Sequence, residues 1–248
     1  MWAEQFEEED IPIAEFENIG LSKDGLVTLN DQDLKALLSG GRTNLIHLMN
    51  LTNGEQRIPE LEAKLSLRRN GQGKLDLLIH PIYRKERVPD FMPDEDAVKL
   101  ADGDISSFYK TIDVNGKKKN VIVEFDQDTK EFIITDSEQI LVPDFVNSDG
   151  LTPEQKRKYK QGETIEMPDG TKLRYSATTA EGIRSNKARL ITSLVMDGGL
   201  SFMLYTAIKA LSKKEPKVSQ EYSKGYYQAL EDMNVRKIKD RMNRAPSR

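Results

Sequence analysis

The chain of 248 residues lacks cysteine and contains only two histidines and one tryptophan. Without cysteine there is no disulfide bond, no thiolate metal site and no thiol nucleophile. His47 and His80 each fall on an expected strand, and two isolated imidazoles are too few to indicate a catalytic relay or a histidine-rich metal site. The glycine-rich phosphate-binding patterns and the H-E-x-x-H zinc pattern are also missing. We therefore predict a protein that is not an enzyme and carries no cofactor, with a hydrolase built on a carboxylate-bound metal as the weaker alternative.

Long apolar runs are also missing from the sequence. The most apolar stretch, residues 188–211, is divided into two halves by Asp197, Gly198 and Gly199. Each half is well short of the ~20 residues that a bilayer-spanning helix needs. Residues 1–20 lack the basic start and the apolar run of a signal peptide. We expect no membrane partner, and a location in the cytoplasm or inside a phage particle.

The net charge of −4 hides an uneven distribution of charge along the chain. The first 20 residues carry seven acids and no base, whereas the last 13 carry six bases and one acid. Such asymmetry indicates two surfaces with different partners, and the two ends could also attract each other within one chain or between copies. Closely spaced carboxylates recur, as at Asp126 and Asp128, but that stretch lacks the central glycine of a calcium loop. We predict no metal site.

Three stretches share one order of signals: a helix cap, a short helix, a glycine, a strand, a tight turn and a second strand. Self-similarity of this kind indicates a duplicated unit. It predicts an α+β fold made of repeated small helix plus antiparallel β-meander units, followed by a C-terminal helical region. The cap, the glycine and the turn are Asn30, Gly40 and Asn53-Gly54 in the first copy, Pro93, Gly103 and Asn115-Gly116 in the second, and Thr152, Gly162 and Asp169-Gly170 in the third.

The predicted organisation follows from these signals and from the linkers between them. Prolines and mixed charge mark 81–92 and 139–150 as linkers. Phe16, Ile19 and Leu21 are expected to dock on the first unit. The predicted parts are an acidic N-terminal arm at 1–29, repeat units at 30–81, 92–138 and 151–185, and a C-terminal helical region with a basic tail at 186–248.

Within these parts, hydrophobic periodicity places the elements. Ala63, Leu65 and Leu67 alternate with polar residues and predict a half-buried strand. Residues 187–211 are expected to form a helical hairpin that breaks at 197–199, and 218–243 one or two charged helices. Two of the remaining expected helices are at 31–39 and 156–160, and another has Pro93 near its first turn and ends before Gly103. The remaining strands are at 45–49, 75–79, 107–114, 119–125, 131–135, 164–167 and 171–177.

Clustered cations are the best candidates for a contact site, because neutralising phosphate groups requires several lysines or arginines close together. Tyr83, Tyr159 and Tyr175 lie near such clusters and could stack on bases. The sequence pI of about 5.5 is low for a nucleic-acid-binding domain. The candidate nucleic-acid contacts are Arg68, Arg69, Lys74, Arg84, Lys85, Arg87, Lys117, Lys118, Lys119, Arg236, Lys237, Lys239, Arg241 and Arg244.

A resemblance to a known family rests on motifs spread over residues 10–185. The stretch 151–173, with its Leu-Thr-Pro-Glu-Gln-Lys stem, carries the most characteristic motif, and shorter ones lie at 11–12, 16, 19–22, 37–40, 65–69 and 79–81. The chain thereby resembles an uncharacterised domain family that is common in proteins of conjugative and other mobile elements of Bacteroides-like bacteria, sometimes beside topoisomerase-like regions. The resemblance implies a mobile-element or phage context and brings no catalytic residue.

The functional expectation is a non-enzymatic interaction module of a mobile genetic element or phage, which binds a protein partner through its repeated α+β units. One alternative is a nucleic-acid-binding accessory protein in DNA transfer, processing or packaging. Another is a structural component of a phage particle. The C-terminal helices are a candidate surface for forming a homo-oligomer.

Overall fold

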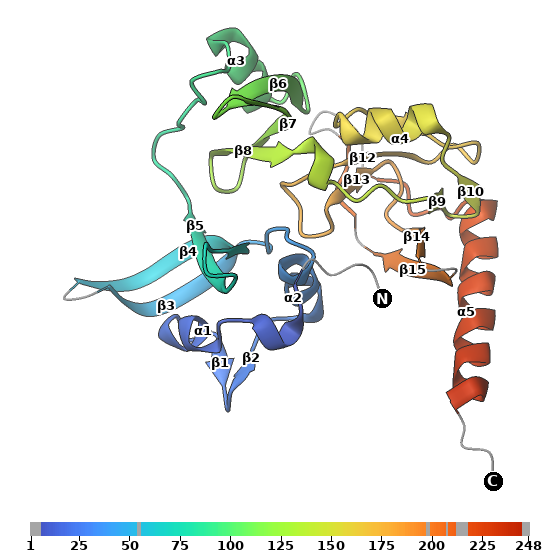
Figure 1. The fold of residues 1–248 in the computed structure, drawn as a ribbon, viewed down its shortest axis with the longest axis horizontal. Helices are drawn as coiled ribbons and strands as arrows, with labels where there is room; N and C mark the ends of the chain where they lie inside the picture. Colours follow the sequence, from blue (N-terminus) through green and yellow to red (C-terminus); the bar gives the residue numbers. More distant parts are fainter. Residues whose placement is uncertain (1–5, 54–55, 197–198, 207, 212–217, 245–248) are drawn as a thin grey trace. The chain divides into compact units, whose positions relative to one another are not determined.

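The computed structural model describes residues 6–53, 56–196, 199–206, 208–211 and 218–244 of the chain (Figure 1). The chain divides into two compact units. The N-terminal unit comprises Ala3–Ser137 together with Ser176–Gly182, and the C-terminal unit comprises Glu138–Tyr175 and Ile183–Arg248 with the first two residues. The segment Ser176–Gly182, called the strap below, therefore belongs to the N-terminal unit although both its flanks belong to the other.

The fold is α+β, and each of the three predicted units is a helix followed by a three-stranded antiparallel meander. This confirms the predicted fold class, although the third strand of the third unit, at 183–185, is not among the predicted strands. The first unit contains α2 (Asp31–Leu38), β3 (Ile46–Asn53), β4 (Gln56–Arg69) and β5 (Leu75–Pro81). The second contains α3 (Asp94–Asp102), β6 (Phe108–Val114), β7 (Lys117–Asp126) and β8 (Glu131–Asp136), and the third contains α4 (Pro153–Lys160), β11 (Ile165–Glu166), β12 (Lys172–Tyr175) and β13 (Ile183–Ser185).

Local side-chain chemistry explains where these helices begin and where the hairpins turn. The Asn30 side chain accepts a hydrogen bond from the Asp33 amide and caps α2. Thr152 and Gln155 form the predicted capping box of α4. Asn115 and Gly116 have φ values of 55° and 78°, which suit a two-residue hairpin between β6 and β7. The predicted first turn at Asn53-Gly54 includes Gly54, which lies outside the described residues.

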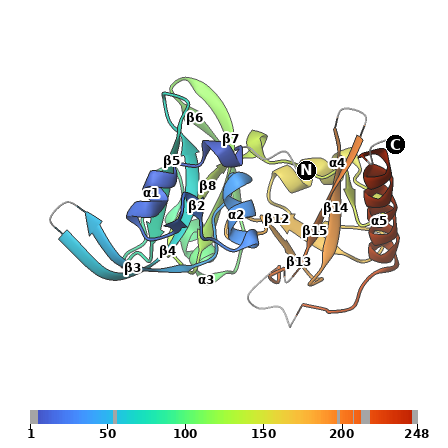
Figure 2. The ribbon, with the colours of Figure 1, turned by 90° about the horizontal axis from the view of Figure 1, so that it is seen from below.

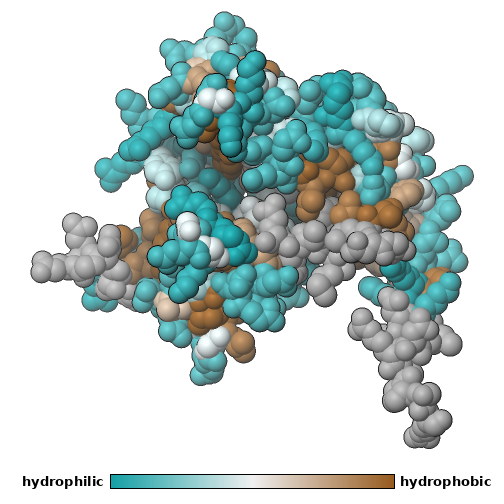
Figure 3. Space-filling view, in the orientation of Figure 1, coloured by the Kyte–Doolittle hydropathy of each residue, from teal (hydrophilic) through white to brown (hydrophobic). Residues whose placement is uncertain are grey.

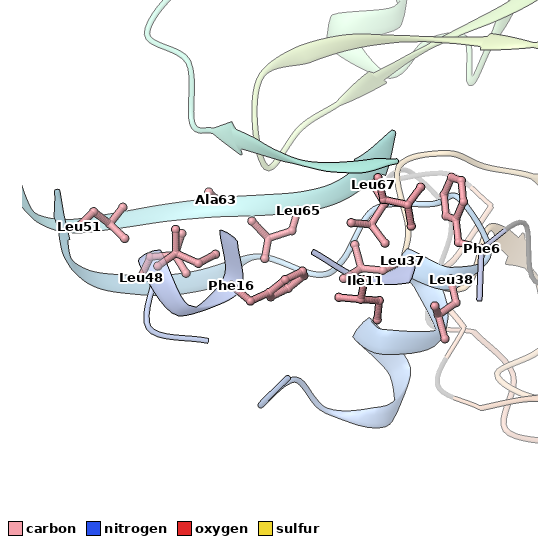
Figure 4. Packing of buried hydrophobic residues seen from close by; sticks show 12 residues of the cluster. Phe6, Ile11, Phe16, Leu37, Leu38, Leu48, Leu51, Ala63, Leu65 and Leu67 are labelled. Carbon is pink, nitrogen blue, oxygen red and sulfur yellow. The ribbon is translucent and has the colours of Figure 1, made fainter. Parts of the chain in front are cut away.

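The core of the N-terminal unit begins with the acidic segment before α2. This segment forms a short 3₁₀ helix (Glu8–Asp10), α1 (Ile13–Asn18), β1 (Ser22–Lys23) and β2 (Leu26–Val27). Phe16 is fully buried against Leu37 and Leu65, which come from α2 and β4 (Figure 4). Ile19 and Leu21 join the same cluster, as the sequence predicts. Burial of each large apolar side chain contributes about 1.5–3 kcal/mol, so this segment is part of the first core.

A second apolar cluster covers one face of the β6–β7–β8 meander. Met92 and Leu100 pack from the α3 side against Val123 and Phe132 of the sheet. The rings of Phe125 and Phe132 lie 4.8 Å apart. Residues directly opposite each other in paired strands share a face, so Glu124, Asp126 and Glu131 point to the other face, which α3 leaves uncovered.

The C-terminal unit corrects the prediction of a helical hairpin at 187–211. This stretch forms β14 (Leu190–Met196) and β15 (Gly199–Tyr205), which pair as an antiparallel hairpin. Asp197-Gly198 falls between the two strands, and Asp-Gly is a strong hairpin signal. The predicted linker at 139–150 also contains β9 (Phe145–Val146) and β10 (Asp149–Gly150), which complete a four-stranded sheet in the order β10-β9-β14-β15. A further 3₁₀ helix (Ser137–Gln139) precedes β9.

The predicted charged helices at 218–243 are one helix, α5 (Lys224–Arg244). Tyr226 and Ala229 are buried against Ile191 of β14, and two views show α5 running beside the β14–β15 hairpin (Figures 1 and 2). The charged helix α4 presents mainly hydrophilic side chains to the solvent (Figure 3). Within the part of the chain that the structure describes, no helix combines the length and the apolar character needed to cross a bilayer.

Candidate functional site

The polar face of β4 is the least expected part of the N-terminal unit. Ala63, Leu65 and Leu67 are buried in the first core, as the alternation predicts. Lys64 lies on the opposite face of the same strand and is only 1% exposed. Lysine is almost never fully buried unless it is paired, so the surroundings of Lys64 mark a built site.

The Lys64 ammonium group is held by two carboxylates and one carbonyl oxygen. Its Nζ lies 2.8 and 3.0 Å from the two carboxylate oxygens of Asp126 and 2.9 Å from Asp128. It also donates to the Thr178 carbonyl oxygen at 3.0 Å. An ammonium group has three protons, so these three partners satisfy it fully. Full satisfaction offsets the several kcal/mol, roughly, that removal of each ion from water costs.

The partners of Lys64 come from two distant parts of the chain. Asp126 ends β7 and is itself buried, and the Asp128 amide donates to the Asp126 carboxylate at 3.0 Å. This hydrogen bond closes a local turn, and the turn holds both carboxylates toward Lys64. Thr178 belongs to the strap. The site therefore joins the first meander, the second meander and a segment that is made much later in the chain.

Glu124, two residues before Asp126 on β7, also binds the strap. Its carboxylate accepts from the Ser176 hydroxyl at 2.9 Å and from the Ala177 amide at 2.6 Å. Gln32 of α2 donates to Glu181 at 2.5 Å, at the other end of the strap. The hydrogen bonds from Ser176 and Ala177 satisfy the Glu124 carboxylate, which is only 2% exposed and therefore needs partners.

A second set of polar contacts also joins the first two meanders. The Ser66 hydroxyl lies 2.8 Å from His80 Nε2, and His80 Nδ1 lies 3.4 Å from Glu131. Arg42 forms an ion pair with the same carboxylate. Burial raises the pKa of Glu131, but hydrogen bonds from His80 and Arg42 outweigh it and lower the pKa to about 2. Glu131 is thus an anion that two cationic or hydrogen-bonding groups share.

The order serine, histidine, glutamate is also the order of a hydrolase relay. In such a relay the carboxylate orients one imidazole, and hydrogen-bond donors stand ready beside the serine to stabilise an oxyanion. Here Arg42 shares the Glu131 carboxylate, and Ser66 lies in the middle of β4, where the strand is paired with β5 opposite Leu78. The arrangement favours a structural link between two sheets over a nucleophile.

The two meanders thus meet through complementary charge. The first contributes Lys64 and His80, with Arg42 before β3, and the second contributes Asp126 and Glu131, with Asp128 in the turn between them. This site is not evident from the sequence, because each of its residues is an ordinary strand or turn residue by itself. The available signal was Lys64, a lysine in a strand whose neighbours Ala63, Leu65 and Leu67 are all apolar.

The predicted basic contacts of the first meander lie together at the β4–β5 turn. Arg68, Arg69 and Lys74 are exposed there. The Arg69 guanidinium lies 5.7 Å from the centroid of the Phe6 ring, donates to the Gly73 carbonyl at 2.5 Å and lies 3.4 Å from Asp10. Arg69 therefore already has partners within its own unit.

The other predicted basic contacts lie on separate segments. Arg84, Lys85 and Arg87 are exposed in the segment between β5 and α3, and Lys117 and Lys118 are exposed at the β6–β7 turn. Lys119 forms an ion pair with Asp136 at 2.9 Å. Lys118 is eight residues along β7 from Asp126, or roughly 26 Å at 3.3 Å per residue. The β6–β7 turn is therefore at the far end of its strand from the Lys64 site.

The last group of predicted contacts is on α5 in the C-terminal unit. Lys237 and Lys239 are exposed there and Arg236 is half-buried. The side chains of Arg241 and Arg244 lie outside the described residues. The two units differ strongly in charge: the C-terminal unit holds 20 bases and 13 acids, a net charge of +7, and the N-terminal unit holds 17 bases and 28 acids, a net charge of −11. Nine of the 14 candidate cations thus belong to the acidic unit.

A neutral counterpart of the Lys64 site lies in the C-terminal unit. Asn147, in the turn between β9 and β10, is 3% exposed and has a φ of 55°. Its Nδ2 donates to Asp169 at 2.7 Å and to the hydroxyls of Thr171 and Ser223 at 3.2 Å, and its Oδ1 accepts from the Ile191 amide at 3.2 Å.

This hub fixes the start of α5. The Ser223 hydroxyl accepts from the Tyr226 amide at 3.1 Å and acts as a helix cap. Burial raises the pKa of Asp169, but hydrogen bonds from Ser223, Thr171 and Asn147 lower it below its usual value. The hub therefore joins the β9–β10 turn, the β11–β12 turn and the first turn of α5.

The acidic clusters show no sign of a metal centre within the residues that are described, since no group of three or more potential ligands gathers there. Comparison with known proteins finds one similarity. Residues 6–90, about a third of the chain, match the model of a family described as a protein of unknown function (DUF4099). No curated protein and no solved structure matches the chain.

The match confirms that this part of the chain is similar to an uncharacterised domain family. It ends within the segment after β5, so it covers the first meander and the elements that pack on it. Phe16, Leu37 and Leu65, which belong to the motifs noted in the sequence, are fully buried in the first core. The shared motifs therefore concern the fold of this region and assign no chemistry.

Proposed function

We propose that the chain is a non-enzymatic interaction module that binds a protein partner through its α+β units. The observation that carries this proposal is the edge of β4. β5 pairs with β4 only from Ala63 to Arg69, whereas β3 pairs with it from Gln56 to Ala63. Among the strand pairs of the described residues, 57–62 of β4 therefore have a partner strand on one side only. Figures 1 and 2 show this ribbon running out beyond β5.

An unpaired strand edge is a template for another extended chain. Pro59 lacks an amide donor, and Glu60 and Glu62 are exposed. Proline and charge on an edge oppose unselective pairing, so this edge selects its partner. Met49 lies directly opposite Glu60 on β3 and is 60% exposed. The edge fits an extended peptide segment with cationic side chains near the glutamates.

The buried ionic sites support a role without catalysis. Lys64, Glu124 and Glu131 are all engaged with partners from other segments of the same unit. These side chains are already bonded to other parts of the fold, whereas an active site needs groups that face a substrate. We therefore assign these residues to stability.

The biological context is proposed on the resemblance alone. The motifs at 10–185 resemble those of proteins from mobile elements, which supports a role in a mobile genetic element or phage. A structural component of a phage particle would use the same edge to bind its neighbours in the particle. A role in DNA transfer, processing or packaging would add a nucleic-acid contact to the protein contact.

The edge is tested by capture of proteins from the native host with the full chain. We compare wild type, the edge variant Glu60→Lys/Glu62→Lys, and the control variant Asp94→Lys/Asp102→Lys, which reverses two exposed acids of α3 in the same unit. The proposal expects a partner that the wild type and the control retain and that the edge variant loses. It also expects slower amide hydrogen exchange at 57–62 in the complex. Equal capture by all three proteins, or unchanged exchange at 57–62, would contradict strand addition at this edge.

A further inference from the structure

We propose that the C-terminal unit binds single-stranded nucleic acid, with Tyr227 of α5 as the stacking platform and nearby cations as phosphate contacts. This surface lies on a different unit from the β4 edge, so the proposal does not depend on the protein partner. It rests on three observations: the charge of the unit, the geometry of a tyrosine cluster and the cations beside it.

The charge of the unit provides the electrostatic attraction. The C-terminal unit carries a net charge of +7 within a chain whose net charge is −4. The low pI of the whole chain therefore reflects the acidic N-terminal unit and does not describe this one. A basic unit attracts a polyanion, and neutralised phosphates release condensed counterions, which gives the affinity its salt dependence.

Three tyrosines at the start of α5 form a rigid aromatic cluster. The rings of Tyr222 and Tyr226 stack with centroids 4.9 Å apart, and Tyr226 is buried against the sheet. Tyr227 stands edge-on to both, at 5.6 Å from Tyr222 and 6.0 Å from Tyr226. It is nevertheless 58% exposed. An exposed ring that two neighbours hold in place is pre-organised to stack on a base, which every nucleotide can offer.

Cations lie near the tyrosine cluster on two segments. The Arg189 guanidinium, just before β14, lies 5.5 Å from the centroid of the Tyr222 ring and donates to its hydroxyl at 2.7 Å. Arg189 and Lys224 are exposed, and Lys237 is exposed further along α5. Arg189 and Lys224 are thus available as phosphate contacts at the cluster, and Lys237 lies about 15 Å further along α5 at 1.5 Å per residue. Clustered cations beside an aromatic platform are the usual contacts for a single strand.

Exposed acids also lie near the platform, namely Glu221 beside Tyr222 and Glu231 and Asp232 on α5. Glu231 sharpens the proposal. Glu231 lies one helical turn after Tyr227, so the two side chains are neighbours on the surface of α5. It is exposed and would repel a phosphate near the platform. The surface therefore predicts a variant that binds more tightly than the wild type, which a merely structural tyrosine cluster does not.

The test is a fluorescence anisotropy titration of the full chain with a labelled oligothymidylate of roughly 20 nucleotides, repeated at several salt concentrations. A duplex of the same length is the second probe. Wild type is expected to bind the single strand with an affinity that falls as salt rises, with a log–log slope near −2 if three phosphates are contacted, at about −0.7 per phosphate. Tyr227→Ala is expected to weaken binding about 5- to 100-fold, and Tyr227→Phe to keep it.

Matched variants separate this surface from general charge. Lys237→Gln should weaken binding and make the salt slope shallower by about 0.7, and Glu231→Gln should tighten binding. Tyr109→Ala and Lys118→Gln alter an exposed tyrosine and an exposed lysine of the N-terminal unit and should change nothing. Circular dichroism confirms the folding of each variant, and light scattering in the same buffers reports self-association.

Each other outcome overturns the proposal. Binding that is absent at low salt removes it. Equal losses from Tyr109→Ala and Tyr227→Ala would place the contact elsewhere. If the chain binds the duplex and Tyr227→Ala does not weaken that binding, Tyr227 is not a stacking platform. Salt-sensitive self-association without oligonucleotide binding would show that the basic surface pairs with the acidic unit of a second copy.

Discussion

Each of the two units uses one buried polar side chain to join segments that are distant along the chain, but the chemistry of the two junctions differs. In the N-terminal unit, Lys64 joins three chain segments through a buried ion pair with Asp126 and a hydrogen bond to the Thr178 carbonyl oxygen. In the C-terminal unit, Asn147 joins three chain segments through a buried amide. Each hub side chain is almost completely buried. The comparison separates what charge contributes to a buried junction from what hydrogen-bonding geometry contributes.

The difference lies in what happens when one partner is lost. A buried ion that loses its counter-ion retains its full desolvation cost. When the Asn147 amide is lost, the Asp169 carboxylate keeps its hydrogen bonds from Ser223 and Thr171. The other groups left unsatisfied are neutral, which costs less per group. The Lys64 site should therefore be the more fragile of the two under substitution.

The largest effect is expected for Lys64→Met. The substitution fills the space of the side chain but leaves the buried Asp126 carboxylate without its cation. We expect a loss of about 3–5 kcal/mol in the free energy of unfolding, measured by urea denaturation of the full chain. Lys118→Met, at an exposed turn position, should change the free energy of unfolding by less than about 0.5 kcal/mol. A loss below about 1 kcal/mol for Lys64→Met would mean that water replaces the ammonium group.

A smaller effect is expected for Asn147→Ala in the C-terminal unit. The variant removes the amide that binds Asp169, Thr171 and Ser223. We expect a loss of about 2–4 kcal/mol. Asn147→Gly removes the same hydrogen bonds but tolerates the φ of 55°, so it should be less destabilising than alanine by about 1 kcal/mol. If the two variants are equally destabilised, the left-handed backbone carries no strain for alanine.

Acid should weaken the N-terminal unit through Glu131. Its pKa in the folded protein is about 2, below its usual value of 4.5, so the stabilisation is complete above pH 4.5 and is lost as the pH falls toward 2. The shift corresponds to about 3 kcal/mol, and the partial exposure of this side chain reduces the expectation to about 1–2 kcal/mol. Denaturation curves between pH 5 and pH 2 measure it. Glu131→Gln should flatten the pH dependence in this window, and an unchanged slope would show that other carboxylates dominate.

The smallest effect is expected for Gly225→Ala at the start of α5. An added Cβ would lie 3.0 Å from the Ser148 hydroxyl and 3.3 Å from both Asn147 Cβ and an Asp169 carboxylate oxygen. The close approach disfavours alanine, while its helix propensity favours it by about 1 kcal/mol. We expect a net destabilisation of about 0–1 kcal/mol in thermal melting. A clear stabilisation would show that the Asn147 hub can shift to make room.

Local signals made much of the fold predictable from the sequence. The caps at Asn30 and Thr152 depend on neighbouring residues, and so does the turn at Asn115-Gly116, so each could be recognised in a short window. The helix and the first two strands of each unit followed from these signals, whereas β13 was not among the predicted strands. The hairpin of β14 and β15 could not be predicted with certainty from the sequence, because an apolar run allows both a helix and a strand and Asp197-Gly198 can interrupt either.

The ionic site could not be predicted in the same way. Lys64, Asp126 and Thr178 are separated by 62 and 52 residues along the chain, and only the packing of the two meanders and the strap brings them together. Asn147 carries no signal either, because its left-handed backbone and its partners appear only in the folded turn. Pairings of this kind depend on tertiary structure and leave no periodic trace.

The strap gives the protein a particular order of assembly during synthesis. Residues 1–137 leave the ribosome first, and in this period Lys64 and Glu124 have no access to Thr178, Ser176 or Ala177. Chains generally fold from the N-terminus as they emerge. The first two meanders therefore lack their hydrogen bonds to the strap until this seven-residue segment is translated, about 40 residues later. A nascent chain that stalls before residue 176 would therefore hold a half-closed sheet pair, a natural substrate for chaperones or proteases.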